Sequence, residues 1–238
     1  MQQIHSGSMR VFDLAVRLFH WLQVVLIAAL WFSAEQEWYG LHQTLAFVLA
    51  SFLGARIIWG FVGSDTAKFS QFVPSLARLK QYLREKQPAV GHNPLSALMI
   101  LALLLLVLLQ FFSGLMTTDE VMTEGPLYSV VPDWLSGLAG SWHELGFNLL
   151  LGLVALHVGA ALLHQWRGDR VVSAMWHGRK NLPVTGSITG SITVPEPNLR
   201  RVTGYLLLVA VFLAGFAWWQ GSAVWPQLLA DLQAIQAL

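Results

Sequence analysis

Four histidines lie inside hydrophobic segments of this 238-residue chain. His143 and His157 are 14 residues apart, from 143 to 157, which is close to four turns of one helix. Both imidazoles therefore face the same side, about 21 Å apart along the axis. His20 lies in the first hydrophobic segment and His42 at the start of the second. Ionisable groups at such depth are costly and usually functional, and this spacing predicts two bis-histidine haem sites, one above the other.

The composition predicts an integral membrane protein and excludes an ordinary soluble domain of this length. Hydrophobic residues make up 55% of the chain, charged residues only 11%, and the mean hydropathy is +0.55. A helix needs roughly 20 apolar residues to cross the hydrocarbon core. Five continuous apolar stretches have about this length and predict helices rather than barrel strands: residues 15–33, 41–62, 94–116, 142–163 and 202–219.

The basic residues predict how these spans are oriented. All 14 Lys and Arg residues lie at the start of the first span, near the end of the second, or in the second-to-third and fourth-to-fifth connections. By the positive-inside rule that side is cytoplasmic. The opposite connections carry acidic residues and no basic one, namely Glu35, Glu37, Asp119, Glu120, Glu124 and Asp133. We therefore expect five spans in a bacterial cytoplasmic (inner) membrane, with the amino terminus in the cytoplasm and the carboxyl terminus in the periplasm.

This topology pairs the histidines by depth. The first span runs outward, so His20 lies towards the cytoplasm, and the second runs inward, so His42 lies at the periplasmic end. The fourth span also runs inward, from His143 on the outside to His157 towards the cytoplasm. Depth therefore pairs His42 with His143 and His20 with His157. We expect the first span to be retained, because cleavage as a signal peptide would discard His20.

The residue types narrow the cofactor. The chain has no cysteine, which excludes covalent c-type haem attachment, iron–sulfur clusters held by thiolates and thiolate zinc sites. Two noncovalent haem b groups, each with two neutral imidazoles as iron ligands, are the simplest cofactors. Two other interpretations stay open: histidines that only hydrogen-bond a neighbouring helix, and a histidine-lined proton or metal transporter without haem. A haem absorption spectrum would distinguish the transporter from a cytochrome.

Two arginines lie near the depth of the inner histidine pair. Arg56 is 14 residues past His42, from 42 to 56, on the inward-running second span and so reaches the level of His157. Its guanidinium either pairs with a haem propionate or snorkels to the cytoplasmic headgroups. Arg17, one turn before His20, is a second candidate partner for a propionate.

Short motifs along the chain, in their order and spacing, resemble those of the prokaryotic cytochrome b561 family, which includes the b-type subunits of nickel–iron hydrogenases. The likeness covers about residues 11–180 and rests on RLFHW at 17–21, LH at 41–42, RIIWGFVG at 56–63, GHNPL at 91–95, HE at 143–144, LH at 156–157 and MWHGRK at 175–180. The resemblance implies a four-helix dihaem cytochrome b that exchanges electrons between membrane quinones and a redox partner. It implies iron ligands at His20, His42, His143 and His157.

The fifth span is a departure from a minimal four-helix member of that family. We therefore expect an all-α membrane protein in which a four-helix transmembrane haem-binding bundle is followed by a fifth transmembrane helix. Residues 1–180 would form the dihaem domain, 181–201 a cytoplasmic linker, and 202–238 the fifth helix with a periplasmic tail.

The expected function is electron transfer across the membrane between the quinone pool and a periplasmic partner, either a c-type cytochrome or a hydrogenase. No cluster of general bases or nucleophiles is evident in the sequence, so haem and quinone would carry the chemistry. We expect the quinone near the inner haem, where the polar residues Arg56, Arg17, His164 and Trp59 lie at one depth. Membrane lipid is the other expected partner, a homodimer is left open, and no nucleic-acid partner is expected.

Two connections have the composition of contact surfaces. The cytoplasmic stretch 72–86 mixes apolar and basic residues, which suits an amphipathic helix on anionic lipid. The periplasmic stretch 116–141 is acidic yet rich in apolar residues and precedes His143 directly. It either receives a basic partner or serves only as a lid.

Overall fold

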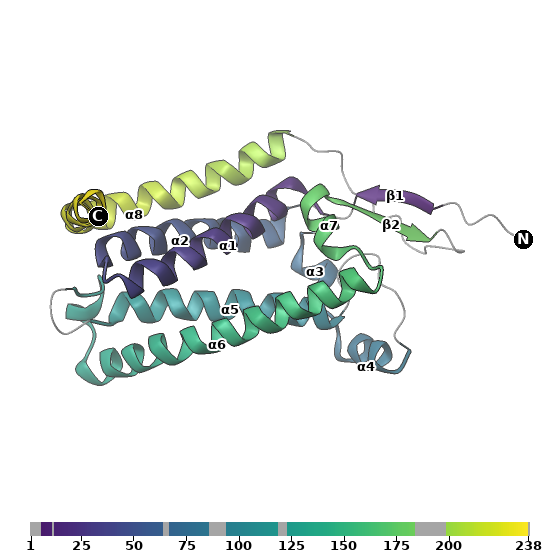
Figure 1. Ribbon diagram of the computed structural model, residues 1–238, viewed down its shortest axis with the longest axis horizontal. Coiled ribbons are helices and arrows are strands. Elements are labelled where there is room, and N and C mark those ends of the chain that lie inside the picture. The colour runs from purple at the N-terminus through teal and green to yellow at the C-terminus, as the bar shows by residue number, and fades with distance from the viewer. Residues whose placement is uncertain are drawn as a thin grey trace, which may run out of the picture. The chain divides into compact units, whose positions relative to one another are not determined.

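The computed structural model describes residues 6–10, 12–63, 67–85, 94–118, 123–183 and 199–237. In chain order its elements are β1 (Ser6–Arg10), α1 (Leu14–Glu35), α2 (Tyr39–Val62), α3 (Phe69–Phe72), α4 (Leu76–Glu85), α5 (Pro94–Met116), the short 3-10 helix η1 (Tyr128–Val130), α6 (Asp133–Trp166), α7 (Val171–His177), β2 (Arg179–Pro183) and α8 (Leu199–Gln236) (Figure 1). Within the described residues, the helices α1, α2, α5, α6 and α8 are long and apolar enough to cross a membrane. The chain is an all-α integral membrane protein, which confirms the predicted class.

The first three spans have nearly the predicted extent, whereas the last two are longer. α6 begins at Asp133 instead of 142, and α8 continues to Gln236 instead of ending at 219. Hydropathy detects only the apolar part of a helix, while the helix continues as long as its backbone hydrogen bonds do. At 1.5 Å per residue, the 34 residues of α6 span about 51 Å, well beyond a hydrocarbon core of about 30 Å.

A short antiparallel ribbon joins two segments that are distant in the sequence and was not predicted. β1 pairs with β2, with Ser6 opposite Pro183 and Arg10 opposite Arg179. Neither strand shows the alternation of apolar and polar residues that predicts a half-buried strand. Of the predicted linker, residues 181–183 belong to β2 and 199–201 to α8, and residues 184–198 lie outside the described residues.

The chain divides into two compact units, and each of the five long helices contributes a part to both. The first unit comprises Met1–Leu18, Arg56–Ala102 and Leu153–Tyr205. The second unit comprises Phe19–Ala55, Leu103–Gly152 and Leu206–Leu238. His42 and His143 therefore belong to the same unit, the second.

In the second unit α8 packs antiparallel against α2 along a stripe of residues spaced seven apart, Gly40, Phe47 and Gly54. The ring of Phe212 lies over Gly54, where a Cβ atom would come within 2.8 Å of Cζ. Phe216 packs on Phe47, with 4.9 Å between the ring centroids, and the end of α8 lies against Gly40. Small residues let membrane helices approach closely, so these two glycines account for the tight fit of α8.

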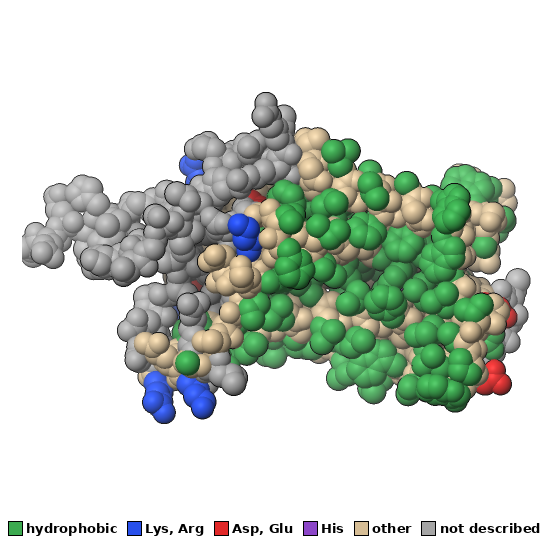
Figure 2. Space-filling model, turned by 180° about the vertical axis from the view of Figure 1, so that it is seen from behind, with side chains coloured by type: hydrophobic (Ala, Val, Ile, Leu, Met, Phe, Trp, Pro, Cys, Tyr) green, Lys and Arg blue, Asp and Glu red, His purple; other side chains and the backbone are tan. Residues whose placement is uncertain are grey.

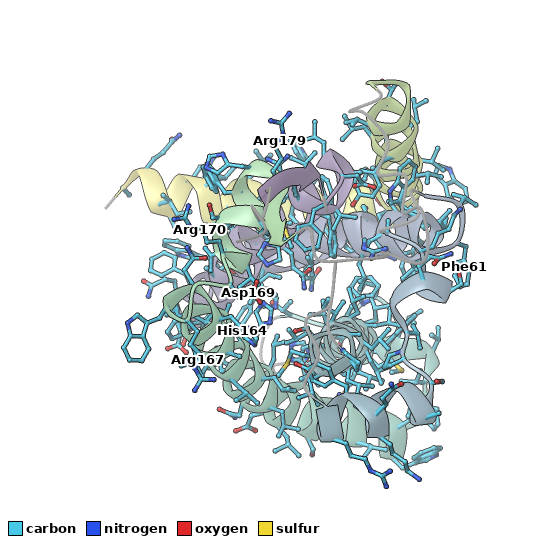
Figure 3. The ribbon with its side chains drawn as sticks, turned by 90° about the vertical axis from the view of Figure 1, so that its right-hand side faces the viewer. Phe61, His164, Arg167, Asp169, Arg170 and Arg179 are labelled. Carbon is cyan, nitrogen blue, oxygen red and sulfur yellow. The ribbon has the colours of Figure 1, made fainter. Side chains whose placement is uncertain are left out.

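The end of α8 turns away from the direction of the rest of this helix. Its last turns, drawn in yellow, are seen end-on in Figure 1 and lengthwise in Figure 3. α8 contains Pro226, and a proline inside a helix removes one backbone hydrogen bond and bends the axis. The part of the sequence that was predicted to be a periplasmic tail is therefore a helical segment, and it crosses the amino-terminal end of α2.

The outward faces of the long helices are covered by hydrophobic side chains in the view of Figure 2, as expected for helices in contact with lipid. The stretch 72–86 contains the helix α4, whose Lys80 and Arg84 are exposed while Leu79 and Tyr82 are partly buried. Lys and Arg side chains gather over this helix in Figure 2.

Candidate functional site

The side chains of His42 and His143 face each other in the second unit. His42 lies in the first turn of α2 and His143 in α6. Their ring centroids are 6.3 Å apart and their planes meet at 75°. The structure thus brings together the two histidines that depth had paired at the periplasmic level.

Both rings are held by main-chain carbonyl groups through the same nitrogen. Nδ1 of His42 lies 3.0 Å from the carbonyl oxygen of Leu30 on α1. Nδ1 of His143 lies 3.1 Å from the carbonyl oxygen of Gln110 on α5. A carbonyl oxygen can only accept, so each Nδ1 carries the proton and donates it. Each neutral ring then keeps the lone pair of Nε2 available for a metal ion.

A serine accompanies each of these carbonyl groups, three residues further along the same helix. The Ser33 hydroxyl donates to the Leu30 carbonyl at 3.0 Å and lies 3.4 Å from Nδ1 of His42. The Ser113 hydroxyl donates to the Gln110 carbonyl at 2.9 Å and lies 3.0 Å from Nδ1 of His143. Both serines are buried, with 0% and 4% of their surface exposed. Each ring is therefore fixed by one backbone carbonyl and one hydroxyl, in the same arrangement on two different helices.

Gln110 holds His143 in two ways. Its main chain accepts the ring proton, and its side-chain Nε2 donates to the His143 carbonyl oxygen at 2.6 Å. Glycines make room for this contact. A Cβ at Gly114 would lie 3.0 Å from Cε1 of His143, and a Cβ at Gly146 would collide with Oε1 of Gln110. The position of the His143 ring is therefore set by close packing between α5 and α6.

The spacing of the two rings fits a haem iron. A bond between a first-row transition metal and an imidazole nitrogen is about 2 Å long. With roughly 1 Å more from each nitrogen to the centre of its ring, an iron bonded to both rings would separate the centroids by about 6 Å. The 6.3 Å observed agrees with this value. No group of three or more His, Cys, Asp or Glu side chains among the described residues is arranged to hold a metal ion, so other ligands would have to come from a macrocycle.

The two histidines of the predicted inner site are partly buried and belong to different units. His20 on α1 is in the second unit, where its ring meets Trp21 edge-to-face with 5.0 Å between centroids. His157 on α6 is in the first unit. Their pairing stays a prediction.

Arg56 is buried in the first unit, with 4% of its surface exposed. Its Nη2 donates to the Ala67 carbonyl oxygen at 3.3 Å, and its guanidinium carbon lies 5.3 Å from the centroid of the Phe69 ring. Nη1 has no hydrogen-bond partner among the described residues. The side chain does not snorkel to an exposed position, because it is enclosed by the segment that follows α2. A buried guanidinium nitrogen without a partner favours an anionic group as its ligand.

Polar side chains from three helices lie around Arg56. Asp13 accepts the Val16 backbone N–H at 2.7 Å as the N-cap of α1, and its other oxygen accepts the indole N–H of Trp59 at 3.3 Å. The Trp59 ring also meets Tyr205 of α8 edge-to-face, with 5.8 Å between centroids. Asp13 and Tyr205 both interact electrostatically with Arg56. The helix α8, which is the fifth predicted span, therefore contributes a buried phenol to this cluster.

The guanidinium of Arg17 joins α1 to α7. Its Nε donates to the Met175 carbonyl oxygen at 3.2 Å, and Nη2 donates to that of Trp176. These carbonyl groups are at the carboxyl end of α7, where a positive charge is favourable. Gly178 follows with φ of 78°, and a Cβ there would lie 2.9 Å from Nη1 of Arg17.

His164, predicted to lie near the quinone, contacts Asp169 at the end of α6. Its Nδ1 is 3.2 Å from Oδ2 of Asp169, and both side chains are between one third and one half exposed. Figure 3 shows the two side chains next to each other, in a region that also contains Arg167 and Arg170.

The sequence analysis missed Ser33, Ser113 and Gln110. Their only signal in the sequence was that each is a polar residue within or at the edge of an otherwise apolar span. Such residues often hydrogen-bond across membrane helices. The shared arrangement, a residue whose carbonyl oxygen accepts the ring proton followed three residues later by a serine, becomes visible only when the histidines are placed beside these residues.

A family model described as prokaryotic cytochrome b561 matches residues 11–178. The Probable Ni/Fe-hydrogenase 1 B-type cytochrome subunit of Escherichia coli (strain K12) is 26% identical over 211 residues, which cover 72% of this chain and 90% of that protein. The protein of the same description from Escherichia coli O157:H7 shows the same identity and coverage. No solved structure matches the chain significantly.

Proposed function

The chain belongs to the prokaryotic cytochrome b561 family, and we propose that within this family it is a dihaem cytochrome that carries electrons across the bacterial inner membrane. As a membrane b-type cytochrome it binds haem b and transfers electrons. The proposal adds the number of haems, their ligands, the quinone and the periplasmic partner. It also adds the orientation, with the amino terminus in the cytoplasm and the carboxyl terminus in the periplasm.

The observation that carries the proposal is the facing pair of His42 and His143. We assign the outer haem to these residues because their centroid distance of 6.3 Å fits a shared iron, and because both Nδ1 atoms are engaged with carbonyl groups. The carbonyl groups and serines hold both rings in one orientation and, for the neutral rings, in one tautomer, which suits iron ligation.

We assign the inner haem to His20 and His157, the pair that the predicted topology places at one depth. Arg56 supports a propionate there, since its buried Nη1 has no partner among the described residues. Arg17 is the second proposed propionate partner, although two of its donors already bind carbonyl groups of α7. The two haems would stand about 20 Å apart in height, within a core of about 30 Å.

Bound haem supplies an iron that takes up and releases one electron. The chain's own residues orient the ligand rings, exclude water and neutralise propionate charge. We place the quinone at the inner haem, for which the first unit supplies the polar side chains of Arg56, Arg17, His164 and Trp59. Quinone redox chemistry also moves protons, and the partly exposed side chains of His164 and Asp169 place an imidazole 3.2 Å from a carboxylate.

The proposed soluble partner is periplasmic. The beginning of α6, before His143, exposes Trp134 and Leu138 at 70% and 59%, and the acidic Glu124 and Asp133 nearby are also exposed. An exposed aromatic side chain among acidic residues suits a docking partner with a basic rim. The two Escherichia coli relatives are described as hydrogenase subunits, which supports a hydrogenase as the partner. A c-type cytochrome is the second candidate.

The haem number is tested by pyridine haemochrome analysis of the purified protein. We expect two haems b per chain, one after replacement of His157 by alanine, and one after replacement of His143 by alanine. The two single-haem variants should have different spectra, because they keep different sites. Two haems in the His157→Ala protein would contradict the pairing, and a colourless wild-type protein would contradict the cytochrome itself.

The quinone assignment is tested by the rates of haem reduction. Arg56→Ala and His164→Ala should slow reduction by a quinol analogue more than electron exchange with the periplasmic partner. Glu144→Gln, which changes an exposed side chain near His143, is the comparison. If Glu144→Gln abolishes reduction by quinol while the other two changes leave its rate unaltered, the quinone binds at the outer haem.

A further inference from the structure

The first turn of α2 is capped by a residue of α8. The initial backbone N–H groups of a helix have no partner within the helix and are usually satisfied by an oxygen of the N-cap side chain. Trp38, which precedes α2, offers no such oxygen. The Leu41 N–H instead donates to Oδ2 of Asp231 at 2.8 Å, across 190 positions of the sequence. The Tyr39 N–H donates to the Glu37 carbonyl oxygen at 3.0 Å, and His42, the residue after Leu41, makes the first bond of helical spacing, to the Trp38 carbonyl oxygen at 2.8 Å.

A second contact holds the end of α8 against the same turn. A Cβ at Gly40 would lie 2.5 Å from backbone atoms of Gln227 and Leu228, so only glycine permits this approach. The Thr44 hydroxyl donates to the Gly40 carbonyl oxygen at 2.8 Å, one turn further on. The contacts of Gln227, Leu228 and Asp231 with the first turn of α2 are made by the part of α8 that follows Pro226.

We propose that Asp231 of α8 is a positioning residue for His42, and that through Asp231 this helix sets the geometry and the redox potential of the outer haem. The inference rests on the proposed function. The ends of helices fray, and His42 lies within the first turn of α2, so the backbone that carries its ring depends on that turn even though the ring itself contacts Leu30 and Ser33. Asp231 satisfies the last free N–H before His42 and places a carboxylate at the positive end of α2. A carboxylate near the site also favours the oxidised iron, which carries one more positive charge.

The experiment compares three variants in the His157→Ala protein, which keeps only the outer haem. Asp231→Ala removes both the acceptor and the charge. Asp231→Asn keeps an acceptor oxygen, since asparagine caps helices as well as aspartate does, and removes the charge alone. Gln233→Ala, which changes an exposed side chain of the same segment, is the matched control. Three properties are measured: amide exchange of residues 39–46 in haem-free protein, the low-spin electron paramagnetic resonance signal, and the midpoint potential.

We expect Asp231→Ala to raise exchange of the first turn of α2 about fivefold, the change that corresponds to about 1 kcal/mol of lost capping, and to shift the low-spin signal. Asp231→Asn should leave exchange and signal close to those of the control and should move the midpoint potential to more positive values. If Asp231→Ala changes neither the signal nor the potential relative to Gln233→Ala, the inference is wrong, even where exchange rises.

Failure of the inference and failure of the proposed function give different results. If the protein with His42 and His143 intact takes up no haem, the assignment of the outer haem fails, while amide exchange still reports whether Asp231 caps α2. If Asp231→Ala does not fold, the near-isosteric Asp231→Asn decides, since an unchanged midpoint potential in that variant would overturn the electrostatic role.

Discussion

Replacement of Gly114 by alanine is expected to weaken haem binding at the outer site without weakening the fold. The added methyl group would lie 3.0 Å from Cε1 and 3.4 Å from Nδ1 of His143. Carbon atoms in contact prefer about 3.5–4.0 Å, so the ring has to retreat by about 0.5 Å. Its hydrogen-bond distances, 3.0 Å to Ser113 and 3.1 Å to the Gln110 carbonyl oxygen, are within the normal range, and a retreat of the ring away from these partners would take them beyond it.

Loss of one or both hydrogen bonds costs about 1–2 kcal/mol, which corresponds to haem binding that is about 5- to 30-fold weaker. Alanine is the better helix former by about 1 kcal/mol, so the haem-free protein should be as stable as before or more stable. The assay is titration of haem into haem-free His157→Ala protein, followed by Soret absorption, beside a thermal unfolding curve. Gly137→Ala is the control, because a Cβ there meets no atom within 4 Å. Unchanged haem affinity in Gly114→Ala would refute the packing argument.

Three further predictions concern the serines beside the outer histidines, the topology of the spans, and the turn between α1 and α2. Ser113→Ala should weaken outer haem binding by up to about fivefold, the equivalent of one neutral hydrogen bond. Ser33→Ala should weaken it less, because Ser33 is 3.4 Å from its histidine and Ser113 only 3.0 Å. Haem titration of both variants measures this order, and a larger effect of Ser33→Ala would contradict it. A reporter that is active only in the periplasm should be active when fused after Leu238, and cytoplasmic activity at that point would rule out five spans. Glu37→Gly should raise the free energy of unfolding, measured by denaturant titration, by up to about 1 kcal/mol. Glu37 has φ of 58°, in the left-handed region, which is costly for a residue with a Cβ atom. A clear loss of stability would show that contacts of the Glu37 side chain contribute more to stability than the backbone strain costs.

The sequence predicted the long helices well because each apolar span is a local property. The depth pairing of His42 with His143 also followed from local information, since basic residues set the direction of each span and the spans set the level of each histidine. The structure brings these two side chains together in one unit. By contrast, the extension of α6 to Asp133 could not be read from hydropathy, because its first turns have the composition of a loop.

Contacts made by the main chain or over long sequence distances escaped prediction for a different reason. Asp231 and Leu41 are 190 positions apart, and nothing in either neighbourhood indicates the other. The environment of Arg56 was likewise undetermined, because its partners are a backbone carbonyl group and the face of Phe69. Neither kind of partner leaves a charge or motif in the sequence.

The acceptors that orient the two facing histidines belong to the polypeptide backbone, at Leu30 and Gln110. Every amino acid supplies a carbonyl group, so residue 30 is free to vary among helix-forming apolar residues while the ring of His42 keeps its partner. Comparison of related sequences by side-chain identity would therefore register the histidines and serines but overlook half of the structure that fixes the ligand rings. In the design of a membrane haem protein, the corresponding requirement is the register between neighbouring helices, which places a chosen carbonyl group opposite a chosen imidazole, in addition to the serine beside each ring.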